Sequence, residues 1–164
     1  MKTQGSEYPN IERLQGSIIV PYNVTPFTGD DSDGYRYGLI YHAQCVPADD
    51  LDYWKKQVIK VLQSELQSHI YSAYDPGTQT TVSAYMARAI ALNRQDIISE
   101  CAAVQEWIDG VLAYYDERKS LIETADSEVG LTGVTWDFAG DVPCHNRKDW
   151  RDIKTMFDEE GGVS

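Results

Sequence analysis

Three groups of side chains in this sequence have the residue types that calcium binding, zinc binding or acid–base catalysis requires. The first is an acidic loop in which Asp31, Asp33 and Gly34 match the third, fifth and sixth positions of an EF-hand calcium loop. The match fails at both ends of the loop. Gly29 occupies the first ligand position and Ile40 the twelfth, where calcium requires a bidentate glutamate. We therefore interpret this loop as a solvated turn.

The second group comprises two cysteine–histidine pairs, which together supply the four ligands of a tetrahedral zinc site. His42 precedes Cys45 by three residues, and Cys144 is followed directly by His145. The usual two-residue spacer therefore occurs only once, and adjacent residues point in different directions in an extended chain. The sequence predicts no metal and no other cofactor. We expect His42, at a strand end, and His145, beside a helix cap, to be ordinary polar surface residues.

The third group is Glu65 and His69, which stand one helical turn apart as a general acid and base could. The sequence has neither a glycine-flanked serine nor a papain-like cysteine context that would supply a nucleophile. A solvated contact on the flank of an apolar helix face is the simpler interpretation, so we predict that the protein is not an enzyme. An enzyme that uses His42, His69 and the carboxylates is the less favoured alternative.

Helices are the main elements that the sequence predicts, and the longest is around Ile97–Ile122. Its apolar residues recur at steps of four and three, interrupted only at Arg118, and this stripe must be buried because a single helix is marginal in water. The stripe comprises Ile97, Cys101, Val104, Ile108, Val111, Tyr115 and Ile122. Two partner helices are predicted upstream, with Asp49 as the N-cap of the first and Asp75, before Pro76, as the N-cap of the second.

Short strands are predicted on both sides of the helices. Ser17–Val20 is β-branched and Tyr35–Tyr41 alternates, which indicates a small antiparallel sheet. Two strands alone are unstable, so this sheet must pack on the helices, gain a strand or lie against a partner. Residues 134–138 also alternate and predict a third strand, and Asn146 is a candidate cap for a short helix that follows.

The predicted fold is α+β, mainly α, with a three-helix bundle as its largest part. The helices are expected at about residues 50–71, 76–93 and 96–124, beside a small N-terminal antiparallel sheet, a short C-terminal strand and helix, and polar terminal arms. We expect three regions along the chain. Residues 1–16 form an N-terminal arm, residues 17–125 a helical core with a small β-hairpin, and residues 126–164 a linker, a short strand and helix, and an acidic tail.

Charge and hydropathy exclude some classes of partner. The chain has 14 Lys and Arg against 26 Asp and Glu, a formal net charge of -12. Its densest basic group, Arg147, Lys148 and Arg151, is interleaved with aspartates, so we expect no direct contact with nucleic acid. No run is apolar enough for a signal peptide or a membrane span, and three widely spaced cysteines predict no disulfide framework.

Aromatic residues are the more unusual feature, because the chain has 11 tyrosines. Amphipathic rings suit protein interfaces as well as core edges, since interface cores favour aromatic residues and are depleted of charge. We predict interface roles for eight aromatic residues, which are Tyr35, Tyr37, Tyr71, Tyr74, Tyr114, Trp136, Trp150 and Phe157.

Several short motifs follow one another in a characteristic order. They are Ile-Ile-Val-Pro-Tyr-Asn at residues 18–23, Tyr-Arg-Tyr at 35–37, Ser-His-Ile-Tyr at 68–71, Tyr-Asp-Pro-Gly-Thr-Gln at 74–79, Val-Gln-Glu-Trp-Ile at 104–108, Tyr-Tyr at 114–115 and Thr-Trp-Asp-Phe at 135–138. Over about residues 16–138 the chain resembles small virion proteins of tailed bacteriophages, particularly those of the tail, baseplate or fibre-attachment region.

This resemblance implies a non-enzymatic structural subunit, present in several copies. Its expected partners are other virion structural proteins and copies of itself, with no nucleic acid and no membrane. The expected location is the virion, after synthesis in the host bacterial cytoplasm. Two alternatives stay open. One is a head-to-tail connector or adaptor subunit, and the other is a soluble assembly chaperone or binding module that is absent from the mature particle.

Overall fold

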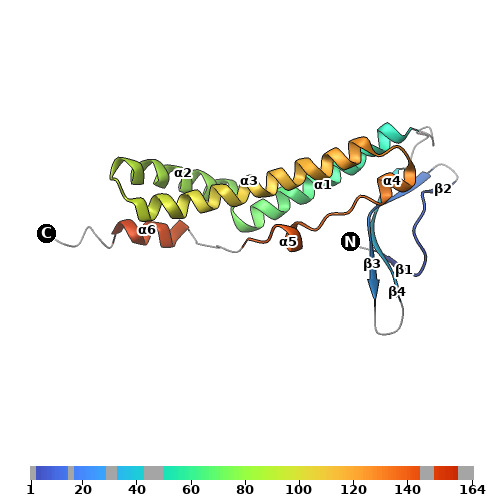
Figure 1. Cartoon of the computed structure of the whole chain (residues 1–164), viewed down its shortest axis with the longest axis horizontal. Helices are drawn as coiled ribbons and strands as arrows, with labels where there is room; N and C mark the ends of the chain where they lie inside the picture. The colour runs from blue at the N-terminus through green and yellow to red at the C-terminus, as the bar shows by residue number, and fades with distance from the viewer. Residues whose placement is uncertain (1–2, 15–16, 29–32, 43–49, 145–149, 159–164) are drawn as a thin grey trace. The chain divides into compact units, whose positions relative to one another are not determined.

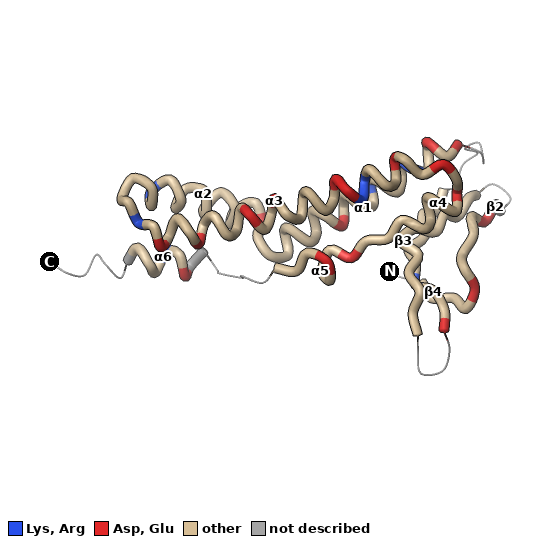
Figure 2. Tube along the Cα trace, viewed as in Figure 1, with Lys and Arg blue, Asp and Glu red and all other residues tan. Residues whose placement is uncertain are grey.

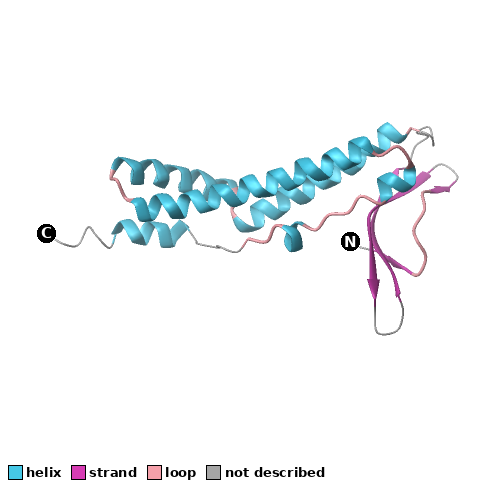
Figure 3. Ribbon diagram, in the orientation of Figure 1, coloured by secondary structure: helices cyan, strands magenta, loops and turns pink. Residues whose placement is uncertain are grey.

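A computed structural model of the chain describes residues 3–14, 17–28, 33–42, 50–144 and 150–158 (Figure 1). Within these ranges the protein is mainly helical with one small antiparallel sheet (Figure 3), which confirms the α+β, mainly α fold class. Contacts divide the chain into two compact units. Unit 1 comprises Met1–Ser64 and Tyr115–Asp137, and unit 2 comprises Glu65–Tyr114 and Phe138–Ser164. This division differs from the three regions expected from the sequence.

Three long helices are found close to their expected bounds: α1 (Leu51–Ala73), α2 (Pro76–Ala91) and α3 (Gln95–Thr124). Asp75 caps α2 as predicted, because its carboxylate accepts hydrogen bonds from the Thr78 amide at 2.9 Å and hydroxyl at 3.0 Å. These bonds favour the ionised form and hold the pKa of Asp75 below its usual value. The residue before α1 is Asp50, which accepts a hydrogen bond from the Tyr53 amide at 2.9 Å, whereas Asp49 lies outside the described residues.

The sheet of unit 1 has four strands in the order β1-β4-β3-β2. Strands β3 (Ser17–Thr28) and β4 (Asp33–His42) form the expected hairpin. The prediction that residues 1–16 are an arm is wrong for two segments. Strand β1 (Thr3–Gly5) pairs with β4, and β2 (Glu12–Leu14) pairs with β3. The hairpin thus gains the additional strands that its stability requires.

The chain after α3 forms three short helices: α4 (Glu128–Thr132), α5 (Phe138–Asp141) and α6 (Trp150–Asp158). The expected C-terminal helix is present as α6, but the strand predicted over residues 134–138 is wrong. Residues 134–137 are irregular and Phe138 begins α5. The reason is a contact distant in sequence, because a side chain of β3 satisfies the main chain of Trp136 in place of a neighbouring strand.

The apolar stripe of α3 is buried as predicted, except that Tyr115 is partly exposed. Most of the stripe packs in unit 2, where α1 and α2 also contribute buried residues, whereas its C-terminal end packs in unit 1. The unit 1 core contains Trp54, Val58, Leu62, Ile122 and Leu131, and the unit 2 core contains Ile70, Val82, Ile97, Cys101 and Val111. Among the described helices, none combines the length and apolar character needed to cross a membrane.

Candidate interaction surfaces

A buried asparagine of β3 fixes the chain that follows α4 in unit 1. Asn23 lies where β3 has a bulge between Tyr22 and Thr25, and its φ of 52° is in the left-handed region, which asparagine tolerates better than most residues. Its Nδ2 donates to the Trp136 carbonyl at 2.9 Å, and its Oδ1 accepts from the Trp136 amide at 2.9 Å. One side-chain amide therefore satisfies both main-chain groups of Trp136, across 113 positions of sequence.

The ring of Trp136 is fixed by a second contact with β3. It stacks on Tyr22, with ring centroids 5.8 Å apart and planes 12° from parallel. Tyr22 in turn lies over Gly38 of β4, where an added Cβ would be only 2.1 Å from the tyrosine Cζ. A side chain at position 38 would displace the Tyr22 ring from this place, so Gly38 helps to set the position of Trp136.

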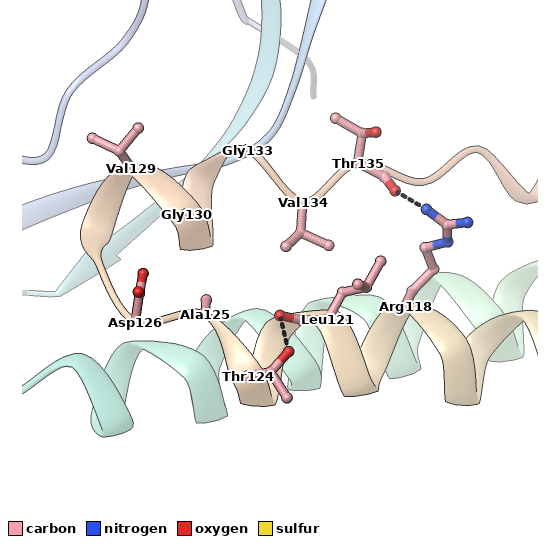
Figure 4. Close-up of a pocket in the computed structure, with 10 residues that line it drawn as sticks. All are labelled: Arg118, Leu121, Thr124, Ala125, Asp126, Val129, Gly130, Gly133, Val134 and Thr135. Atoms are coloured by element: carbon pink, nitrogen blue, oxygen red, sulfur yellow. Dashed lines mark hydrogen bonds between the residues drawn. The ribbon is translucent and has the colours of Figure 1, made fainter.

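Residues 133–135 form one side of an open groove of about 490 Å³, which polar and apolar residues line together, and the C-terminal end of α3 forms the other side (Figure 4). Leu121 and Val134 point toward one another across the groove, while Val129 points away from it. Leu121 is 43% exposed and Val129 is 68% exposed. At one end, Arg118 Nη1 donates to the Thr135 carbonyl at 3.4 Å. The groove therefore combines exposed aliphatic side chains with walls that are held in place.

In unit 2 an aromatic cluster, defined as His69, Tyr74, Trp107, Tyr114 and Phe138, binds the chain around α5. Its neighbouring rings have centroids 5.3 to 5.8 Å apart. The carbonyl of Val142 accepts a hydrogen bond from Trp107 Nε1 at 3.2 Å and lies 3.0 Å from His69 Nε2. Tyr114 also donates its hydroxyl hydrogen to the Asp141 carboxylate. The cluster thus fixes residues 138–142 within unit 2.

Of the candidate catalytic and metal-binding residues, the two histidines that the structure describes pack against aromatic rings. His69 stacks on Phe138 and faces a main-chain carbonyl, so its Nε2 carries a proton and acts as a donor. His42 lies at the end of β4 as expected and is half-buried, with its ring 5.3 Å from Tyr53 and 6.2 Å from Trp54. Cys45, His145 and the acidic loop at residues 29–32 lie outside the described residues. Within the described ranges, no three metal-binding side chains gather.

The eight aromatic residues predicted at interfaces have different environments. Tyr74, Trp136 and Phe157 are buried in the core of the chain itself, so the structure places them away from the surface. Phe157, for example, contacts the ring of Tyr85 and has the guanidinium of Arg88 over its own ring. The side chain of Trp150 is not among those that the structure describes. Tyr35, Tyr37 and Tyr114 are half-buried and Tyr71 is exposed.

Besides Tyr71, six large apolar residues of the described chain are exposed, and the sequence interpretation placed none of them at an interface: Tyr41, Ile90, Leu92, Leu112, Leu121 and Val129. The exposure of Leu121 could have been predicted, because Leu121 is an apolar residue of α3 that falls outside the buried stripe. Val129 lies in a segment that is otherwise polar and glycine-bearing, where one apolar residue gives no pattern.

Comparison of the chain with models of known protein families, with curated protein sequences and with solved structures gave no match.

Proposed function

We propose that this protein is a non-enzymatic structural subunit of a bacteriophage virion, located in the tail, baseplate or fibre-attachment region. It would be made in the host cytoplasm and act by contacts with neighbouring subunits in a multi-copy assembly. The observation that carries the proposal is the open groove of unit 1, which has the exposed Leu121 on one wall. The virion setting rests on the motif order described above, from residues 18–23 to 135–138, which resembles that of small phage virion proteins.

The groove suits a protein partner for a physical reason. Complete burial of a leucine or valine side chain contributes about 1.5–3 kcal/mol relative to exposure. Leu121 still exposes a large fraction of its surface, so a partner that covers it in the groove gains part of this energy. The wall at residues 133–137 is already fixed by Asn23 and Tyr22, so little order has to be imposed when a partner binds.

A second candidate is a soluble assembly chaperone that leaves before the particle matures. The net charge of -12 favours it, since a strongly acidic surface keeps a protein soluble while it covers an aggregation-prone partner. The two functions differ in where the protein ends up. Mass spectrometry of purified mature particles finds a structural subunit at a constant ratio to other virion proteins and does not find a chaperone.

The contribution of the groove is tested by Leu121→Glu, with Leu112→Glu as the matched control. Both leucines are on α3 and similarly exposed, at 43% and 41%, but only Leu121 lines the groove. We expect Leu121→Glu to lower incorporation into particles about tenfold or more, because it puts a charge in the contact. Leu112→Glu should be incorporated normally. Equal loss with both variants, or absence of the wild-type chain from mature particles, would contradict the proposal.

A further inference from the structure

A second surface of unit 1 follows from the strand order. Strands β1 and β2 lie at opposite edges of the sheet, yet β1 ends at Gly5 and β2 begins at Glu12. The short connection between them must therefore cross one face of the two central strands. Between this crossing segment and β4 lies a cleft of about 540 Å³. We call it the sheet cleft. Its main side chains are Glu7, Tyr8, Glu12, Tyr37, Leu39 and Tyr41.

The walls of the sheet cleft are aromatic, and one of them is fixed. The Tyr8 ring packs edge-on against Tyr35 at 5.2 Å, and its hydroxyl lies 3.2 Å from the Thr132 hydroxyl of α4. On the opposite wall, Tyr37 and Tyr41 project from the same face of β4, because alternate residues of a strand share a face. Tyr41 is 68% exposed, so its ring is available to a ligand.

The charge at the sheet cleft is negative. Glu7 and Glu12 are both exposed, and the described side chains that line the cleft include no lysine or arginine. Figure 2 shows the acidic positions on the connection between β1 and β2. Carboxylates attract cations, and the faces of tyrosine rings attract ammonium and guanidinium groups at distances up to about 6 Å. The two features together select a ligand with basic side chains.

We propose that the sheet cleft binds an extended segment of a partner protein. Every second side chain of this segment faces the cleft, in the order lysine or arginine, an apolar residue, and lysine or arginine. The spacing follows from β4. Tyr37, Leu39 and Tyr41 are two residues apart, about 7 Å, and alternate side chains of an extended segment have the same spacing. Basic side chains would then lie beside the tyrosines and an apolar one beside Leu39. This inference names a partner chemistry for the proposed structural subunit and rests on that function.

The probe for this proposal is a fluorescein-labelled peptide, Lys-Thr-Val-Thr-Lys, titrated with the full chain and followed by fluorescence anisotropy. The control peptide Glu-Thr-Val-Thr-Glu has the same spacing and the opposite charge. We expect the lysine peptide to bind and the glutamate peptide not to bind. Binding of both peptides equally, or of neither, would overturn the proposal.

Two variants of the sheet cleft locate the binding. Glu7→Gln with Glu12→Gln should weaken peptide binding about fivefold to tenfold, since two exposed charge pairs are lost. Glu106→Gln with Asp116→Asn removes the same charge from exposed helix positions and should change binding less than about twofold. Equal weakening by both double variants would mean that binding follows net charge alone, and the proposal would be wrong.

Tyr41→Ala supplies a test that does not depend on charge. Tyr41 is exposed, so the substitution should leave the far-UV circular dichroism spectrum unchanged while weakening peptide binding about tenfold. Tyr71→Ala, at an exposed tyrosine of unit 2, is the matched control and should bind normally.

A concentration-dependent dimer of the free chain that disappears in Tyr41→Ala would assign the sheet cleft to a second copy and overturn the proposal. The particle-incorporation experiment above is independent of this one. A chain that is present in virions but binds no lysine peptide loses this inference and keeps the proposed function.

Discussion

Replacement of Asn23 should reveal how much of unit 1 depends on one buried amide. The Asn23→Ala variant removes two hydrogen bonds to Trp136, each 2.9 Å long and both buried. A typical intramolecular hydrogen bond contributes about 1 kcal/mol, so their loss costs about 2 kcal/mol. Alanine at a φ of 52° adds about 1 kcal/mol, because its Cβ disfavours the left-handed region. We expect a total loss of about 3 kcal/mol in the free energy of unfolding, a large part of the stability of an ordinary domain.

Asn23→Gly separates the two contributions. Glycine also lacks the amide but adopts a positive φ without steric cost. This variant should therefore lose only about 2 kcal/mol and be more stable than Asn23→Ala by about 1 kcal/mol. In the interior of an ordinary strand the opposite order is expected, since glycine there lowers the stability of a protein relative to alanine. The order of the two variants therefore reports the backbone conformation directly.

The assay is urea unfolding at constant pH, followed by far-UV circular dichroism, with the slope of the transition compared among variants. Equal slopes are required, because a change of slope means that the unfolded or native state has changed. The reasoning is refuted if Asn23→Ala loses less than about 1 kcal/mol, or if Asn23→Gly is the less stable of the two.

Three further predictions concern the helices. Leu62→Ala should lower the free energy of unfolding by about 2–5 kcal/mol in urea titration, because Leu62 is completely buried in the unit 1 core. The hydrogen bonds that depress the pKa of Asp75 stabilise the fold fully at pH values above the usual pKa of an aspartate. Their contribution to the free energy of unfolding should be lost as the pH falls through the lowered pKa of Asp75. NMR of the Thr78 amide should report this loss, and Asp75→Asn, which caps without titrating, should remove the pH dependence. Burial raises the pKa of Cys101, with the nearby Glu100 as a smaller cause, so iodoacetamide should modify Cys101 only after unfolding, as shown by mass mapping of alkylated peptides.

The helical part of the fold was predictable because its signals are local. The α3 stripe repeats every three or four residues, and Asp75 with Pro76 marks the start of α2 through groups that interact within one turn. The end of α2 is equally local. Asn93 has a φ of 54°, and the Arg94 amide bonds the Ala89 carbonyl, as expected where a helix terminates.

The sheet and the C-terminal segment could not be predicted from the same signals. Thr3–Gly5 and Glu12–Leu14 show no apolar alternation, because their membership of the sheet comes from main-chain pairing. The stretch around Trp136 does alternate, but the groups that satisfy its main chain come from Asn23, which is distant in sequence. A local pattern contains no information about such a partner, and for this reason the strand prediction was wrong.

The candidate surfaces were hidden for a related reason. A tyrosine or tryptophan suits a core as well as an interface, so residue type alone did not separate the buried Tyr74 from the exposed Tyr71. Exposure depends on which segment covers a ring. In unit 2 the chain around α5 packs on the aromatic cluster, and this contact cannot be read from the sequence around Tyr74 or Tyr114.

The contact of Asn23 with Trp136 also connects stability to the proposed function. Val134 and Thr135 form one wall of the groove and directly precede Trp136, whereas Leu121 forms the other wall from α3. Loss of the Asn23 amide therefore releases one wall while the other stays in place. Asn23→Gly should be depleted from particles more strongly than Leu62→Ala at the same loss of unfolding free energy, because only the former alters the groove. If two variants matched in stability are incorporated equally, stability alone governs assembly and the groove is not a contact surface.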